Sequence, residues 1–201
     1  MYTKRDYYLS GVIGAIAGVV ILFPASEFGF RVNVFWGIIS ILLFSLLSVS
    51  GFFLCSFLGK RRQIFFDFGK FSVTGLLNTL IDIAVLNGLF LLSGVATGIS
   101  YALFKAIAYI IATSNSYGWN KFWTFKSMTP LSFKEYGSFF VFSLVGAGIN
   151  IGVASVIVNA IPHPSGMSPE AWGTIAALVA VLFSKFWNFG TYRSVVFARG
   201  K

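Results

Sequence analysis

The sequence predicts an all-α membrane protein with six transmembrane helices and with both termini in the cytoplasm. The first observation behind this prediction is composition: 57% of the 201 residues are hydrophobic and only 10% are charged. Soluble domains carry about 25% charged residues, so this chain could not cover a surface that faces water. The second is a series of apolar runs about as long as a bilayer is thick. The third is the placement of the basic residues, which set the orientation.

Six apolar runs cover residues 8–24, 35–59, 71–93, 98–119, 137–160 and 169–190. They are continuous rather than alternating, which favours helices over a membrane β-barrel. The first run follows basic residues, as in a signal peptide, but it ends at residues 23–27 (FPASE) without the small-residue pattern of a cleavage site. It also contains Gly14 and Gly18, whose spacing lets two helices approach closely. We therefore expect a retained helix.

The basic residues predict the orientation of these helices. Twelve of the 15 Lys and Arg residues fall on one predicted side: Lys4, Arg5, Lys60, Arg61, Arg62, Lys70, Lys121, Lys126, Lys134, Arg193, Arg199 and Lys201. Arg31 is the single Lys or Arg expected on the other side. The positive-inside rule then places both termini in the cytoplasm. The net charge of +9 calls for no nucleic-acid partner, because basic residues beside membrane helices contact anionic lipid headgroups.

A single shift of 72 residues relates two segments of the chain, residues 115–125 (NSYGWNKFWTF) and 187–197 (WNFGTYRSVVF). The shift aligns four pairs: Gly118 with Gly190, Lys121 with Arg193, Phe125 with Phe197, and Asn78 with Asn150. Chance similarity between apolar helices is the alternative, but polar and basic matches at one offset favour duplication. We predict an N-terminal transmembrane hairpin at 1–60 and two helix-pair repeats at 64–125 and 136–197. Repeats of the same topology are related by an axis along the membrane normal.

Three ionisable residues, Asp82, Lys105 and Lys185, fall inside the apolar runs. A charge at a helix centre costs about 2.5–3.5 kcal/mol on insertion scales, so each of them needs a reason to be there. Asp82 and Lys105 are expected at similar depths, either as a structural ion pair or as part of a path for a lipid phosphate. Lys185 lies near the cytoplasmic face, where it could also extend to the interface. The counterparts of Asp82 and Lys105 after the shift are alanines, Ala154 and Ala177, so we expect the two repeats to have diverged in function.

Amide, aromatic and basic side chains alternate at the predicted cytoplasmic ends of the helices. The candidates for binding a sugar and a phosphate there are Asn115, Trp119, Asn120, Lys121, Asn188 and Arg193. An interfacial aromatic belt explains most of the rings but not the interleaved asparagines. A bound sugar-phosphate headgroup would explain all three residue types, because rings stack on a sugar, amides bond its hydroxyls and a cation pairs with phosphate. Asn78 and Asn150 lie beside glycines, where hydrogen bonding between helices is the simpler interpretation.

Two stretches of the first repeat resemble the GtrA family. Residues 71–79 (FSVTGLLNT) contain the Gly-x-x-Asn of the family's first helix, and Asn115, Asn120, Lys121, Trp123, Thr124 and Phe125 match the ending of its second helix. The second repeat matches more loosely, through Asn150, Arg193 and Phe197, and Asn188 is one residue out of register with Asn115. The resemblance covers residues 64–197. The family usually has four helices, so the hairpin at 1–60 has no role implied by it.

The resemblance implies a multi-pass protein of the bacterial cytoplasmic membrane that serves cell-surface polysaccharide modification. It implies that the protein flips a polyprenyl-phosphate-linked monosaccharide, often undecaprenyl-phosphate glucose, to the outer leaflet. The expected partners are that lipid-linked sugar, membrane lipids and a glycosyltransferase. A homo-oligomer is also compatible, because two helix pairs and a hairpin make a thin wall around a large headgroup.

Two other functions remain open from the sequence. A non-transporting scaffold would recruit or anchor a polyprenol-phosphate glycosyltransferase, and its basic loops would then matter more than Asp82 and Lys105. An integral-membrane enzyme is the weaker alternative, because no paired-carboxylate or Ser/His arrangement is present. We expect no cofactor and no metal, since a single Cys55 and a single His163 do not make a conventional site.

Overall fold

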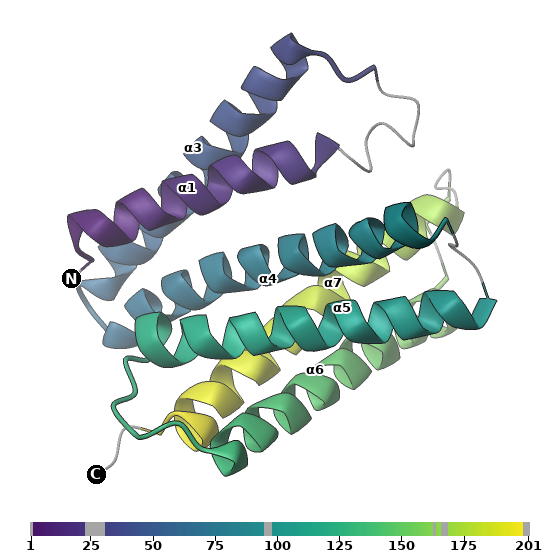
Figure 1. The fold of residues 1–201 in the computed structure, drawn as a ribbon. Coiled ribbons are helices and arrows are strands. Elements are labelled where there is room, and N and C mark those ends of the chain that lie inside the picture. The colour runs from purple at the N-terminus through teal and green to yellow at the C-terminus, as the bar shows by residue number, and fades with distance from the viewer. Residues whose placement is uncertain (1, 23–30, 95–97, 163, 166–168, 199–201) are drawn as a thin grey trace. The chain divides into compact units, whose positions relative to one another are not determined.

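The computed structural model describes residues 2–22, 31–94, 98–162, 164–165 and 169–198, and it is built of helices (Figure 1). The elements are α1 (Lys4–Val20), α3 (Val34–Gly59), α4 (Gln63–Ser93), α5 (Gly98–Trp119), η1 (Asn120–Thr124), α6 (Phe133–Ala160), α7 (Pro169–Thr191) and η2 (Tyr192–Val196). The predicted all-α class is confirmed. His163 lies outside the described residues.

Within the described residues, three helices, α3, α4 and α6, are long and apolar enough to cross a membrane. Together with the composition of the chain, they support a membrane protein. Helices α1, α5 and α7 also coincide with predicted spans. The count of six crossings and the orientation of the termini stay predictions.

The chain divides into two compact units, Met1–Lys126 and Ser127–Lys201. Unit 1 packs the hairpin of α1 and α3 against the pair of α4 and α5, and unit 2 is the pair of α6 and α7. The division falls in the segment that joins the two predicted repeats. The three-part organisation predicted from the sequence remains a prediction.

Helices α1 and α3 pack closely because glycine removes the side chains between them. A Cβ atom on Gly18 would lie 2.6 Å from the Cα of Ile41, and one on Gly14 would lie 2.8 Å from the Cα of Ser45. The close approach lets Ser40 donate a hydrogen bond to the carbonyl of Gly18 at 2.7 Å. The packing role predicted for these two glycines is confirmed.

Both helix pairs end in a π-helical turn, η1 after α5 and η2 after α7. In each turn the closing N–H reaches back five residues, from Phe125 to the carbonyl of Asn120 and from Phe197 to that of Tyr192, both at 2.8 Å. The closing phenylalanines are each 2% exposed. The turns are related by the same 72-residue shift found in the sequence, and the duplication itself remains a prediction. Their π form was not predicted, and such turns are frequent at functional sites.

Candidate functional site

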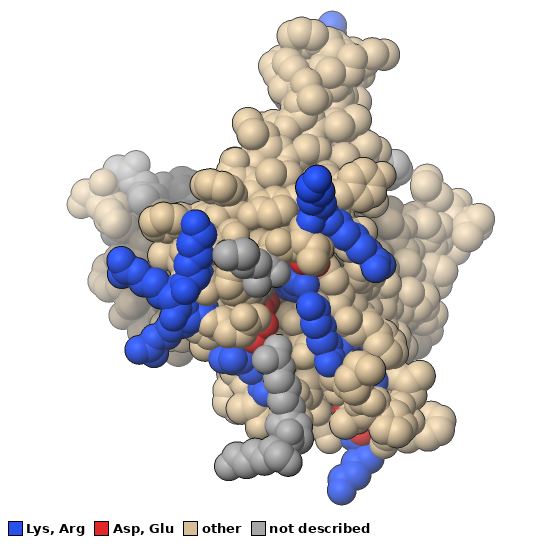
Figure 2. Space-filling view, turned by 90° about the vertical axis from the view of Figure 1, so that its left-hand side faces the viewer, with Lys and Arg blue, Asp and Glu red and all other residues tan. Residues whose placement is uncertain are grey.

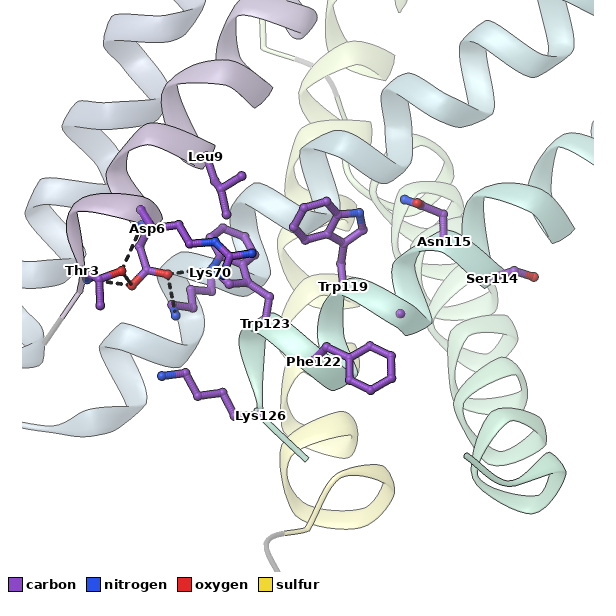
Figure 3. A pocket seen from close by; sticks show the side chains of 12 residues that line it. Thr3, Asp6, Leu9, Lys70, Ser114, Asn115, Trp119, Phe122, Trp123 and Lys126 are labelled. Atoms are coloured by element: carbon purple, nitrogen blue, oxygen red, sulfur yellow. Dashed lines mark hydrogen bonds and ion pairs between the residues drawn. The ribbon is translucent and has the colours of Figure 1, made fainter. Parts of the chain in front are cut away.

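Unit 1 contains a pocket of about 620 Å³ at the end where α1 and α4 begin and η1 ends (Figure 3). We call it the basic-end pocket. Its lining residues are Thr3, Arg5, Asp6, Leu9, Lys70, Ser114, Asn115, Gly118, Trp119, Phe122, Trp123 and Lys126. Figure 2 looks onto this end, where Lys and Arg side chains gather and little Asp or Glu surface shows between them. The pocket is large enough for a small polar ligand, since such sites measure about 300–1,000 Å³.

A buried carboxylate, Asp6, joins three elements at one wall of the pocket. Its Oδ1 pairs with the ammonium of Lys70 on α4 at 2.9 Å and accepts a hydrogen bond from the indole Nε1 of Trp123 on η1 at 2.7 Å. Its Oδ2 accepts from the backbone N–H of Thr3 at 2.7 Å. The Lys70 and Asp6 side chains are 7% and 6% exposed. A buried pair with these additional hydrogen bonds is costly to break from one side.

The start of α1 explains why Asp6 sits where it does. Thr3 is the N-cap residue, and its side chain accepts a hydrogen bond from the Asp6 N–H while the Asp6 side chain accepts from the Thr3 N–H. This reciprocal capping box begins the helix, and a carboxylate is favoured beside a helix N-terminus. Burial by itself raises the pKa of Asp6. The hydrogen bonds from Thr3, Lys70 and Trp123 and the charge of Lys70 outweigh it and lower the pKa to about 2. Asp6 is therefore ionised at neutral pH.

Aromatic rings surround the Lys70 ammonium. Its Nζ lies 5.4 Å from the ring centroid of Trp123 and 5.9 Å from that of Tyr2. Trp119 meets Trp123 edge to face with centroids 5.6 Å apart, and Phe52 stacks on Tyr2 at 3.7 Å. Cation–π contacts and the ion pair together fix the position of Lys70. The same contacts fix the Trp123 ring.

Two further cations line the pocket, Arg5 from α1 and Lys126 from the segment after η1. Both side chains are exposed, and neither forms an ion pair within the described ranges of the chain. Lys126 has a φ of +50°, a left-handed conformation that non-glycine residues rarely adopt. Three cations and one carboxylate give the pocket lining a net charge of +2. The pocket thus suits an anion that also offers a surface for indole stacking.

Of the predicted site residues in unit 1, Asn115 and Trp119 line the pocket. The Nδ2 of Asn115 is buried and has no hydrogen-bond partner among the described residues, so it is a donor available to a ligand. Asn120 and Lys121 do not line the pocket, and both are fully buried. The Asn120 amide donates to the carbonyl of Ser116 at 2.9 Å. The ligand roles predicted for Asn120 and Lys121 remain predictions.

Deeper along the pair of α4 and α5, the structure brings Asp82 and Lys105 together as an ion pair. The Lys105 and Asp82 side chains are 44% and 20% exposed, and the second carboxylate oxygen of Asp82 is buried without a hydrogen-bond partner in the described parts of the chain. Asn78, one turn before Asp82, likewise has an unpartnered Oδ1 there. Together with the Nδ2 of Asn115, these two oxygens make three buried polar atoms on α4 and α5 that lack a hydrogen-bond partner among the described residues.

The remaining candidates lie in unit 2. Asn188 of α7 packs on Gly146 of α6, where a Cβ would lie 2.8 Å from the Cγ of the amide. Lys185 lies one turn before Asn188 and is half-buried, as are Arg193 of η2 and Asn150 of α6. The shared path that we predict for these residues and Lys105 remains a prediction.

All four charged residues of the pocket were missed as site residues in the sequence: Arg5, Asp6, Lys70 and Lys126. Arg5, Lys70 and Lys126 were used only to predict the orientation of the helices in the membrane. A signal for Asp6 was present, because Thr-x-x-Asp before an apolar run is a helix-start pattern. In the described part of the chain, the structure contains no group of three His, Cys, Asp or Glu side chains that could hold a metal ion.

Comparison with known proteins places this architecture in a family. The family described as GtrA/DPMS, transmembrane domain, matches residues 70–197. The membrane protein YngA of Bacillus subtilis (strain 168), which is described as uncharacterized, is 36% identical over 81 residues, or 40% of this chain and 51% of YngA. The chain thus matches about half the length of that relative. No solved structure matches the chain. The chain therefore belongs to the GtrA/DPMS transmembrane-domain family.

Proposed function

We propose that this protein translocates a polyprenyl-phosphate-linked monosaccharide across the bacterial cytoplasmic membrane for cell-surface polysaccharide modification. Family membership supports the broader statement that the protein takes part in the flipping of polyprenyl-phosphate-linked sugars or in glycosylation. The observation that carries the specific proposal is the basic-end pocket, which combines a net positive charge, indole rings and an unpartnered amide donor.

Each component of the pocket matches one part of such a headgroup. Cations pair with the phosphate, which carries one negative charge as a diester. The Trp119 ring offers a flat apolar surface to the sugar, and the Asn115 Nδ2 offers a hydrogen bond to a hydroxyl. Under the predicted orientation the pocket faces the cytoplasm, where the lipid-linked sugar would be loaded. The prenyl chain would stay in the surrounding lipid.

The Asp82–Lys105 pair is the next charged group along the same two helices. Asp82 follows Lys70 by 12 residues, which corresponds to about 18 Å along α4. Lys105 would receive the phosphate from the pocket, and Asp82 would orient the Lys105 side chain. We assign Lys185, Asn188 and Arg193 to later or parallel contacts with the same headgroup. The sequence contains no ATP-binding motif, so we attribute the driving force to the synthesis and consumption of the lipid, and we propose no catalysed reaction.

Leaflet-resolved transport in vesicles that contain only this protein tests the proposal. Undecaprenyl-phosphate glucose is loaded in one leaflet, and its appearance in the other is followed over time. We expect transport above that of empty vesicles, and we expect it to fall at least tenfold in Lys105→Ala. The matched control is Lys60→Ala, since Lys60 lies just after α3 and outside the pocket lining. Full transport by a folded Lys105→Ala protein would remove Lys105 from the path.

The same experiment separates translocation from the scaffold hypothesis. Met128, in the segment between η1 and α6, and Phe133, the first residue of α6, are 94% and 97% exposed, and the basic residue Lys134 follows Phe133. A scaffold would use such a segment to recruit a glycosyltransferase. No transport by the folded protein above empty vesicles, together with loss of glycosyltransferase recruitment in Met128→Ser/Phe133→Ser, would favour the scaffold.

A further inference from the structure

The N-terminal hairpin lies outside the family match, yet it supplies one wall of the basic-end pocket. The match begins at Lys70, whereas Thr3, Arg5, Asp6 and Leu9 line the pocket from the start of α1. The hairpin is joined to the rest of unit 1 by helix packing of α3 and α1 on α4. The role of its pocket-lining polar residues therefore cannot be taken from the family.

Asp6 is an unexpected residue in a pocket for an anion, because a carboxylate repels phosphate. Both of its oxygens are occupied within the protein, by Lys70 and Trp123 at one and by Thr3 at the other. Asp6 thus neutralises one cation of the pocket, and in return it fixes that cation and the Trp123 indole in place. Its chemistry is that of a positioning residue and not of a ligand to the anion.

Arg5 precedes Asp6 on the same helical turn, and it keeps its charge available. Its exposed side chain lines the pocket from α1, and Lys126 lines it from the segment after η1. Because Asp6 balances Lys70, these two cations account for the net charge of +2. An arginine presents several N–H donors in a fixed fork that matches phosphate oxygens. A phosphate that pairs with both would be held by the hairpin and by the segment after η1 together.

We propose that the hairpin completes the phosphate-binding site of this protein: Arg5, together with Lys126, binds the phosphate ester, and Asp6 positions Lys70 and Trp123 for the attached sugar. The ligand class is a sugar phosphate ester. The identification of that ester as lipid-linked rests on the proposed function. A protein without this hairpin would lack Arg5, which is one of the two cations available to the phosphate. It would also lack Asp6, which holds the Trp123 indole in place.

Bulk electrostatics and the positioning role of Asp6 predict opposite effects of Asp6→Asn on anion binding, which makes the proposal testable. Removing a carboxylate raises the net charge of the lining by one, so bulk electrostatics alone predicts tighter binding of an anion. Positioning predicts weaker binding, because an amide at residue 6 no longer balances Lys70 and holds the Trp123 indole less firmly. Asp6→Glu keeps the charge with a longer arm, so it should bind better than Asp6→Asn.

Equilibrium binding to protein in lipid nanodiscs is the experiment. The probes are undecaprenyl-phosphate glucose, glucose 1-phosphate and inorganic phosphate. The chain has five tryptophans, so the part of the tryptophan fluorescence that is lost in Trp123→Phe reports the environment of Trp123. The variants are Arg5→Gln, Asp6→Asn and Asp6→Glu. The matched control is Lys4→Gln, which removes a charge from the same turn of α1 without lining the pocket. Thermal unfolding verifies that each variant is folded.

We expect Arg5→Gln to weaken binding of the lipid-linked probe about fivefold, with a weaker dependence on salt, while Lys4→Gln binds like the unmodified protein. We expect Asp6→Asn to weaken binding and to shift the tryptophan emission. Equal affinities of Arg5→Gln and Lys4→Gln, or tighter binding by Asp6→Asn, would overturn the proposal. Binding of glucose 1-phosphate as tight as that of the lipid form would support the site but assign it to a soluble sugar phosphate.

The readout separates this inference from the proposed function. Binding that depends on Arg5 and Asp6 in a protein that transports nothing would contradict translocation and leave the phosphate site standing. Transport that is unaffected by Arg5→Gln and Asp6→Asn would leave translocation standing and remove the hairpin from the site.

Discussion

Asp6 takes up a proton only in strongly acidic solution, because the native structure holds its charged form with several hydrogen bonds and an ion pair. Its pKa of about 2 lies below the ordinary value of 3.8. A group whose pKa is lower in the folded state stabilises that state above the ordinary pKa, and the stabilisation is lost as the pH falls through the folded value. The contribution of Asp6 is therefore complete above about pH 4 and disappears toward pH 2.

This linkage predicts the pH dependence of Asp6→Asn. Thermal unfolding of the detergent-solubilised protein should show the variant to be less stable at pH 6, by about 2 kcal/mol. The difference should shrink between pH 4 and pH 2, since the unmodified protein then protonates the same residue. A difference that stays constant over this range would show that Asp6 acts through its shape and not through its charge.

Lys126 allows charge and backbone strain to be separated. Its φ of +50° costs a non-glycine residue about 1–2 kcal/mol, and glycine adopts this conformation without the cost. We expect Lys126→Gly to match or exceed the unmodified protein in thermal stability, whereas Lys126→Ala keeps the strain. Both variants should lose affinity for undecaprenyl-phosphate glucose to the same extent in the nanodisc assay. Unequal losses would assign the effect to backbone geometry.

Some contacts between individual side chains could be predicted from the sequence, and others could not. The pairing of Asp82 with Lys105 was predictable, because two opposite charges in apolar helices joined by a short link have few other partners at their depth. The contacts of Asp6 were not predictable in the same way. Its partner Trp123 is 117 residues distant, and no pattern in the sequence links the start of the first apolar run to the end of the fourth.

Among the elements, the hairpin of α1 and α3 depends on glycines that admit no side chain. Replacing Gly18 with Ala would place a Cβ 2.6 Å from the Cα of Ile41, so the helices must separate. We expect Gly18→Ala to lower the stability of the solubilised protein by about 1–3 kcal/mol. It should also weaken the pocket, since α1 holds Asp6.

Gly51 of α3 is the matched control for this prediction, because a Cβ there meets nothing within 4 Å. Gly51→Ala should be neutral or stabilising, as alanine is the better helix former. Thermal unfolding of both variants in one detergent makes the comparison. Equal destabilisation by the two substitutions would contradict the close-packing explanation.

Helix positions were largely predictable from the sequence, and helix ends were not. The apolar runs predicted α3 and α4 because spans of this length have few alternatives in lipid. The π turns η1 and η2 depend on where a phenylalanine is buried, which is a matter of packing. The 72-residue shift nevertheless identified the two segments in which they occur.

For the whole molecule, the placement of basic residues predicts a definite topology. Cys55 is the single cysteine of the chain, so Cys55→Ala provides a background for cysteine labelling in intact cells. We expect Arg31→Cys to react with a membrane-impermeant maleimide from outside. Ser127→Cys, in the segment between the units, should react only after permeabilisation. The reverse pattern would place the basic-end pocket on the outer face and exclude loading from the cytoplasm.

The paired π turns bear on ancestry. Where η1 begins with Asn120, η2 begins with Tyr192, so under the predicted duplication the two copies share a backbone form and differ in polar chemistry. Under that prediction, side-chain patterns built on asparagine lose sensitivity as copies diverge. The five-residue turn closed by a buried phenylalanine, which follows both α5 and α7, is then the feature by which we expect distant relatives of this protein to be recognised.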